Sequence, residues 1–161
     1  MLTDLPDLLR HYSSTERPSA FADWAEGLPR TRVAGTAFWS DVVAEWSGFD
    51  RIDHARFAKL FRRFRSSRRA SMVKHLPGEI RIFRGQDAGD GFGLAWTTDR
   101  AVAEGFAAGH RGIAHDDPFV YEITVTRGEV AFCCDDRGER EIVLLRVTRE
   151  MALEAVDGPG F

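Results

Sequence analysis

The dipeptide Pro77-Gly78 divides the sequence into two stretches with different hydrophobic spacing. Before it, apolar residues recur at intervals of three and four, which is typical of helices that bury one face. After it, apolar and polar residues alternate in short runs, which is typical of strands. Proline and glycine both interrupt regular structure. The sequence therefore predicts an α+β protein, with an N-terminal helical region over residues 1–76 and a small, mostly antiparallel β-sheet with one inserted helix over residues 77–161.

The composition is that of an ordinary folded domain. The chain has 161 residues, of which 43% are hydrophobic and 29% charged, and its net charge is −3. This charge gives no overall attraction to nucleic acid or membranes, and we find no apolar run long enough to span a bilayer. The cysteines, Cys133 and Cys134, are adjacent and therefore cannot join distant segments by a disulfide. We therefore expect the protein to be located in a reducing cytoplasm.

The clearest predicted helix begins near Asp53 and ends at Pro77-Gly78. One face is apolar and comprises Phe57, Leu60, Phe61, Phe64, Met72 and Val73. The opposite face is basic and comprises Arg56, Lys59, Arg62, Arg63, Arg65, Arg68 and Arg69. Two interpretations of the basic face remain open. It is a surface that attracts nucleic acid or another anion, or it is a solvated face partly paired with acidic residues elsewhere.

Arg84 and Gly85 lie at the end of the first predicted strand, which begins at Glu79. A guanidinium group is a planar donor that suits a phosphate or a carboxylate. A glycine beside it lets backbone approach a ligand closely. A structural salt bridge is the alternative explanation of the arginine. The following loop, residues 87–91, matches neither the Gly-x-Gly-x-x-Gly fingerprint nor a P-loop.

The second predicted strand ends in Trp96-Thr97-Thr98, and Asp99 is placed to cap the helix that follows. Hydroxyl groups at a strand end are suited to hydrogen-bond a carboxylate or a ribose. The alternative is that the threonines only reflect the preference of branched side chains for strands.

The segment Glu139-Arg140-Glu141 leads into a strongly apolar predicted strand. In an extended chain, residues i and i+2 share a face, so both carboxylates would project to one side, about 7 Å apart. Catalysis at a sugar carbon uses such a pair, because one carboxylate stabilises an oxocarbenium-like transition state while the other activates the nucleophile. Two exposed glutamates at a strand edge are the alternative.

Taken together and in this order, these segments resemble the ADP-ribosyltransferase superfamily, in its arginine–serine–glutamate branch. In that branch an arginine at a strand end often lies between an aromatic residue and a glycine, as in Phe83-Arg84-Gly85. A Ser-Thr-Ser motif follows, and Trp96-Thr97-Thr98 stands in its place, with Thr97 at the central threonine. A Glu-x-Glu motif then supplies the catalytic glutamate, at the position of Glu141. The resemblance covers residues 79–147 and implies a compact version of that fold.

The resemblance implies that NAD is the substrate and that nicotinamide is released. Arg84, with Gly85 beside it, would contact the NAD phosphates or the nicotinamide ribose. Packing of Trp96 or Phe92 on the nicotinamide ring is our own expectation and is not part of the family pattern.

The resemblance also implies roles for the hydroxyls and carboxylates. Thr97, with Thr98, would hold Glu141 in place. Glu141 would bind the 2′-hydroxyl of the nicotinamide ribose and stabilise the oxocarbenium ion. Glu139 would orient or activate the acceptor, and in the family a glutamate at this position accompanies arginine acceptors.

The leading hypothesis is therefore an enzyme that transfers ADP-ribose from NAD to a protein or nucleic-acid acceptor, with NAD hydrolysis as a variant in which water captures the same ion. The alternative is a non-catalytic module that binds nucleic acid or a protein through the arginine-rich helix 56–69. A third hypothesis is an accessory protein whose N-terminal helices mediate oligomerisation. None of these hypotheses involves a membrane.

Overall fold

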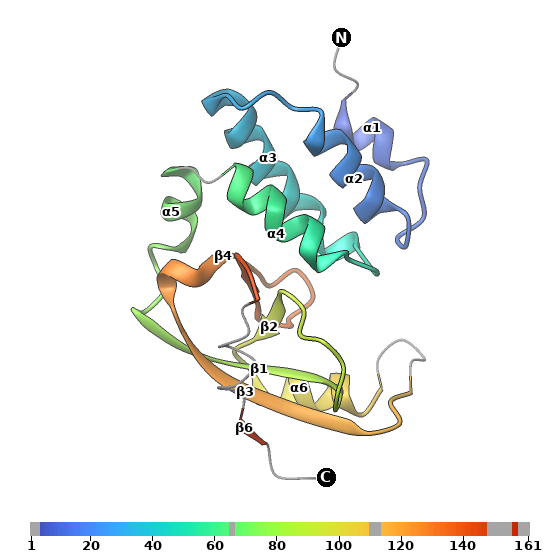
Figure 1. Cartoon of the computed structure of the whole chain (residues 1–161), viewed down its shortest axis with the longest axis vertical. Coiled ribbons are helices and arrows are strands. Elements are labelled where there is room, and N and C mark those ends of the chain that lie inside the picture. The colour runs from blue at the N-terminus through green and yellow to red at the C-terminus, as the bar shows by residue number, and fades with distance from the viewer. Residues whose placement is uncertain (1–3, 65–66, 110–113, 148–155, 158–161) are drawn as a thin grey trace. The chain divides into compact units, whose positions relative to one another are not determined.

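The computed structural model describes residues 4–64, 67–109, 114–147 and 156–157. The chain forms two compact units, residues 1–71 and 72–161. The division lies a few residues before Pro77-Gly78, where the spacing of apolar residues changes. Figure 1 labels most elements of both units.

The first unit is helical. Its elements are α1 (Leu5–Leu9), α2 (Arg17–Glu26), α3 (Arg32–Glu45), the 3₁₀-helix η1 (Trp46–Gly48), α4 (His54–Arg63) and the first part of α5 (Ser67–Val73), whose last two residues belong to the second unit. Its core is aromatic: the rings of Phe38 and Phe64 stack with centroids 4.6 Å apart, and those of Trp39 and Phe61 stack at 5.3 Å. These four residues are almost fully buried, and the burial of Phe61 and Phe64 confirms the predicted apolar face of their helix.

The single helix predicted from Asp53 to Pro77-Gly78 is instead two helices, α4 and α5. Helix α4 ends at Phe64, whose φ of −104° and ψ of 21° are not helical. The indole nitrogen of Trp39 donates a hydrogen bond to the Phe64 carbonyl oxygen at 2.5 Å. That carbonyl therefore has a partner from another helix, and a tertiary contact accompanies the break that hydrophobic spacing alone did not predict.

The second unit contains an antiparallel sheet with the strand order β4-β5-β2-β1-β3-β6. The strands are β1 (Glu79–Asp87), β2 (Ala95–Thr97), β3 (Pro118–Thr126), β4 (Val130–Cys134), β5 (Glu141–Leu144) and β6 (Val156–Asp157). Helix α6 (Arg100–Ala107) follows β2, and the short 3₁₀-helix η2 (Arg127–Glu129) joins β3 to β4. The predicted α+β class, with an antiparallel sheet and an inserted helix, is confirmed.

The capping prediction for α6 is also confirmed. The Asp99 side chain accepts a hydrogen bond from the Ala101 amide at 2.9 Å, which satisfies one of the free N–H groups of the first turn.

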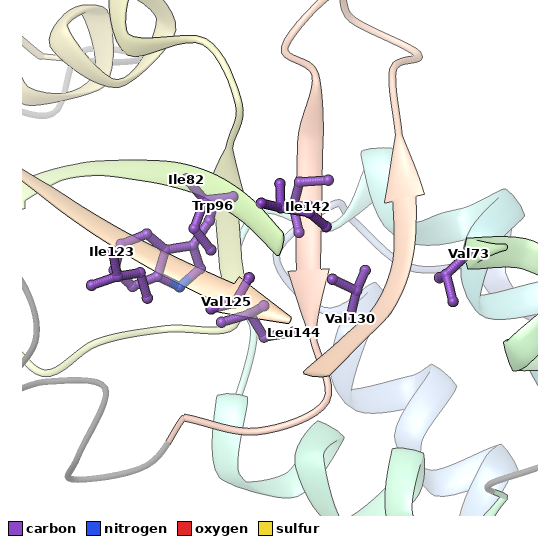
Figure 2. Packing of buried hydrophobic residues seen from close by; sticks show 9 residues of the cluster. Val73, Ile82, Trp96, Ile123, Val125, Val130, Ile142 and Leu144 are labelled. Atoms are coloured by element: carbon purple, nitrogen blue, oxygen red, sulfur yellow. The ribbon is translucent and has the colours of Figure 1, made fainter. Parts of the chain in front are cut away.

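Two apolar clusters cover the two faces of this sheet. On one face, Ile82, Trp96 and Ile123 belong to a buried cluster that Figure 2 shows from close by. On the other face, Phe83 packs with Ala103 and other small residues of α6. Strands β1 and β3 pair along their whole length, whereas β1 and β2 pair only at Phe83 and Thr97. The sheet therefore has a short junction at its centre, next to Arg84.

Candidate functional site

Three neighbouring strands bring the backbone segments of the predicted site residues together. Strand β2 lies between β1 and β5, and Thr97 pairs with Phe83 on one side and with Glu141 on the other. Arg84 follows Phe83 directly in β1. The three segments are far apart in sequence, and they meet across the central junction of the sheet.

Arg84 is half-buried, and two neutral oxygens orient its guanidinium group. Its Nε donates to Oε1 of Gln86 at 2.6 Å, and its Nη1 donates to the carbonyl oxygen of Ala95 at 2.5 Å. Because both acceptors are neutral, these bonds fix the guanidinium plane without cancelling its charge. These partners of Arg84 therefore orient its guanidinium group through neutral oxygens. A salt bridge, which was the alternative explanation, is not what orients it.

Burial lowers the pKa of Arg84 to about 10, and the negative charges of Glu141 and Asp90 oppose this shift. The guanidinium is therefore still protonated at neutral pH. The influence of Glu141 on the pKa of Arg84 also means that the two charged groups lie within electrostatic reach of each other.

Gly85 makes room for helix α6. A Cβ atom at this position would overlap the carbonyl oxygen of Ala103 and lie 2.6 Å from the amide nitrogen of Ala107. The close backbone approach at this glycine is therefore made by the helix. The glycine allows α6 to pack directly behind Arg84.

Trp96 belongs to the core. Its side chain is 4% exposed, and its Nε1 donates to the carbonyl oxygen of Gly93 at 3.2 Å. The indole is thus covered by protein, as Figure 2 shows for its contacts with the cluster, and it does not present a face for nicotinamide. Phe92 is half-buried and meets the ring of Tyr121 edge-on, with centroids 4.8 Å apart. Of the two aromatic residues expected to contact nicotinamide, Phe92 is the more accessible.

Thr97 binds the backbone of the Glu-x-Glu segment. Its Oγ1 donates to the carbonyl oxygen of Glu139 at 2.7 Å and accepts from the amide of Asp99 at 3.0 Å. A threonine hydroxyl has one hydrogen to donate, so the expected bond from this hydroxyl to the Glu141 carboxylate is replaced by the bond to Glu139. The amide of Thr98 donates to the carbonyl oxygen of Arg140 at 3.2 Å. Both threonines thus position the glutamate segment through its main chain.

The two glutamates are not successive residues on one face of a strand. Strand β5 begins at Glu141, and Arg140 before it has a φ of 45°, in the left-handed region that few non-glycine residues adopt. The amide of Arg140 donates to Oδ1 of Asp135 at 3.0 Å. The alternation that predicted two carboxylates on one side therefore does not run through Glu139. A tight turn, fixed by Asp135, sets their directions instead.

Glu141 is half-buried at the first position of β5, where it pairs with Thr97 of β2 and Cys134 of β4. Desolvation raises the pKa of the Cys134 thiol to about 11, and the charge of Glu141 contributes to this shift. The carboxylate thus lies in a region where burial weakens solvent screening. Glu139 is also half-buried.

Sequence reasoning missed Gln86 and Asp135. Gln86 is 5% exposed and bonds Arg84, and its position two residues after the arginine in an alternating strand was the available signal. Asp135 lies in the turn before the Glu-x-Glu segment. Its bond to Arg140 depends on the left-handed conformation of that residue, for which the residue type gives no signal.

The arginine-rich face of the first unit is partly engaged in internal contacts. Arg56 forms ion pairs with Asp23 at 2.5 Å and with Glu26 at 2.7 Å. Arg63 donates to the carbonyl oxygen of Leu28 at 2.6 Å. Further members of the face are Arg69, which is buried, and Lys59 and Arg62, which are exposed. Arg65 and the side chain of Arg68 lie outside the described residues. These contacts favour the interpretation as a face partly paired with acidic residues.

Within the described ranges, no three His, Cys, Asp or Glu side chains are grouped so as to hold a metal ion, and no helix is long and apolar enough to cross a membrane. Comparison with protein-family models, with curated proteins and with solved structures found no match.

Proposed function

We propose that this protein cleaves the bond between nicotinamide and ribose in NAD and transfers ADP-ribose to a protein or nucleic-acid acceptor, with hydrolysis as the variant in which water is the acceptor. The observation that supports this proposal is that Arg84, Thr97 and Glu141 lie on three adjacent strands, with Thr97 paired to Glu141 on one side and to the residue before Arg84 on the other. The fold that this proposal implies is a compact form of the ADP-ribosyltransferase fold.

Glu141 supplies the negative charge that the reaction requires. When the glycosidic bond breaks, its electron pair goes to the ring nitrogen of nicotinamide, and the ribose is left as an oxocarbenium ion. A carboxylate beside the anomeric carbon stabilises that ion, and more strongly where burial limits screening by water. Glu141 is half-buried at the centre of the proposed site, which suits this role.

Arg84 supplies the positive charge for the pyrophosphate of the same substrate. A guanidinium group has five N–H donors. Its Nε and one Nη1 hydrogen are used by Gln86 and Ala95, so other donors remain for phosphate oxygens. The cation is already oriented before substrate binds, which reduces the entropy lost on binding.

Glu139 is the candidate for activating the acceptor. The acceptor forms a new bond to the anomeric carbon and loses a proton, which Glu139 or solvent takes up. Its position before the left-handed Arg140 gives it a direction that is independent of strand alternation. An acidic group here also favours a cationic acceptor, such as the arginine side chain implied by the family resemblance.

The test of this proposal is nicotinamide release from NAD by the purified protein and two variants. We expect Glu141→Gln to lower the rate by about 100- to 1000-fold, the range found when a group that stabilises transition-state charge is removed. Glu79→Gln is the matched control, because Glu79 is exposed at the start of β1 and lies outside the site. Equal release by wild type and Glu141→Gln would contradict the catalytic assignment.

A further inference from the structure

Gln86 is the only side-chain amide in the protein. The sequence contains one glutamine and no asparagine, and this glutamine is among the few buried polar residues, with 5% of its surface exposed. It lies in β1 on the same face as Ile80 and Ile82, which are core residues. An apolar residue would suit a buried position on this face, so the amide needs a specific explanation.

The two ends of the Gln86 amide bond different parts of the proposed site. Its Oε1 accepts from Arg84 Nε at 2.6 Å, and its Nε2 donates to the carbonyl oxygen of Asp90 at 2.9 Å. Asp90 belongs to the loop of residues 88–94, which leads into β2. The Arg84 guanidinium is thus bonded at Nε within its own strand and at Nη1 by Ala95, where this loop ends.

This arrangement suits an amide better than any other side chain. An amide both accepts from the arginine and donates to the loop, whereas a carboxylate only accepts. A carboxylate would also neutralise the guanidinium and weaken its attraction for a second anion. A neutral amide orients the cation and preserves its charge.

We infer that Gln86 is a positioning residue, which sets the plane of Arg84 for the pyrophosphate of a dinucleotide and couples that arginine to the loop 88–94. The inference rests on the proposed function for the identity of the ligand. The coupling between Gln86 and Arg84 rests on the hydrogen bond between them and does not depend on the proposed function. Binding of an anion at Arg84 therefore changes the surroundings of the Gln86 amide and, through Asp90, those of the loop.

A ¹H–¹⁵N spectrum tests the coupling directly. Because the chain has one carboxamide, its NH₂ pair is unique and needs no further assignment. We expect this pair to shift in Arg84→Met without any ligand, and to shift in the wild type on addition of ADP-ribose. Arg62→Met, an exposed arginine in the first unit, is the control that leaves the pair unchanged. An Arg84→Met spectrum with the NH₂ pair in its wild-type position would overturn the coupling.

Kinetics of nicotinamide release test the positioning role. In Gln86→Met the hydrogen bond to a charged group is lost, and we expect the KM for NAD to rise about tenfold with little change in kcat. Gln86→Glu, which has nearly the same size, keeps the acceptor for Nε but adds a charge, so its KM also rises. Gln86→Glu tests the positioning role if Gln86→Met does not fold. An unchanged KM in a folded variant would overturn the inference.

The two measurements separate this inference from the proposed function. If the wild type neither binds ADP-ribose nor releases nicotinamide, the proposed function fails, while the shift in Arg84→Met still decides whether Gln86 and Arg84 are coupled. If the wild type is active and both Gln86 variants match it, the proposed function survives and the positioning role is rejected.

Discussion

Arg56 in the helical unit and Arg84 in the sheet unit are both restrained by hydrogen bonds, but their partners differ in charge. Arg56 bonds the carboxylates of Glu26 and Asp23, which raise the pKa of its guanidinium. Arg84 bonds an amide and a carbonyl oxygen, and burial lowers its pKa to about 10. The charge of Arg56 is balanced by neighbouring carboxylates, whereas Arg84 is oriented by neutral groups and its charge can still attract an anion.

This difference separates a structural cation from a ligand-binding one. A cation paired with carboxylates contributes to folding and has little attraction left for a further anion. A buried cation with neutral partners costs free energy unless something else compensates, and such sites tend to be functional. Variants that change Arg56, Arg84 or their surroundings one at a time test this distinction.

Replacing Arg84 should have the largest effect, and on activity. We expect Arg84→Met to lower kcat/KM for NAD by about 100- to 1000-fold, because an oriented cation contacts the charged part of the substrate. Arg56→Ala should leave kcat/KM unchanged. Steady-state nicotinamide release measures both, and equal losses in the two variants would remove the distinction between the arginines.

Gly85→Ala should destabilise the sheet unit without changing any charge. The new methyl group would meet the backbone of α6 at Ala103 and Ala107, and neither atom belongs to a flexible side chain. We expect a loss of about 2–3 kcal/mol in the free energy of unfolding, measured by urea denaturation. Gly91→Ala is the control, because its Cβ would meet open space. Similar stability of the two variants would mean that α6 does not pack at Gly85.

Arg56→Ala should lower stability by about 1–2 kcal/mol, since it removes a two-pronged bond to Glu26 and an ion pair with Asp23. Arg62→Ala, from the same helix but exposed, should change stability by less than about 0.5 kcal/mol. Thermal or urea unfolding compares them. If Arg62→Ala costs as much as Arg56→Ala, the internal pairing of this face is not what stabilises it.

The smallest effect should appear only at high pH. The pKa of Arg84 is lowered to about 10, so its charge is present below that pH and is lost as the pH rises through it. Binding of inorganic pyrophosphate, followed by calorimetry, should therefore weaken between about pH 9 and 11. Arg56, with a raised pKa, remains charged in this window. Pyrophosphate affinity that stays constant to pH 11 would argue against Arg84 as the anion site.

Local patterns predicted the framework of the site. The alternation from Glu79 and the capping position of Asp99 correctly indicated β1 and α6, because both depend on residues near in sequence. The break of the arginine-rich helix at Phe64 is accompanied by a hydrogen bond from Trp39, a residue of another helix, and no periodicity carries that information.

The finer geometry of the site depends on contacts between strands. The direction of Glu139 follows from the left-handed conformation of Arg140, which bonds Asp135 within the same turn and Thr98 of a distant segment. The function of Gln86 follows from the position of Asp90, which depends on how β2 returns to β1. Such long-range arrangements are properties of the folded chain and were beyond the reach of spacing rules.

The most direct test of the account is a crystal structure of the Glu141→Gln variant with NAD. This variant should bind the substrate without cleaving it. We predict that the pyrophosphate lies against the Arg84 guanidinium and that the nicotinamide ribose lies beside residue 141, with the Gln86 bond to Arg84 preserved. NAD bound elsewhere, or no bound NAD at millimolar concentration, would contradict the claim that the junction of β1, β2 and β5 is a dinucleotide site.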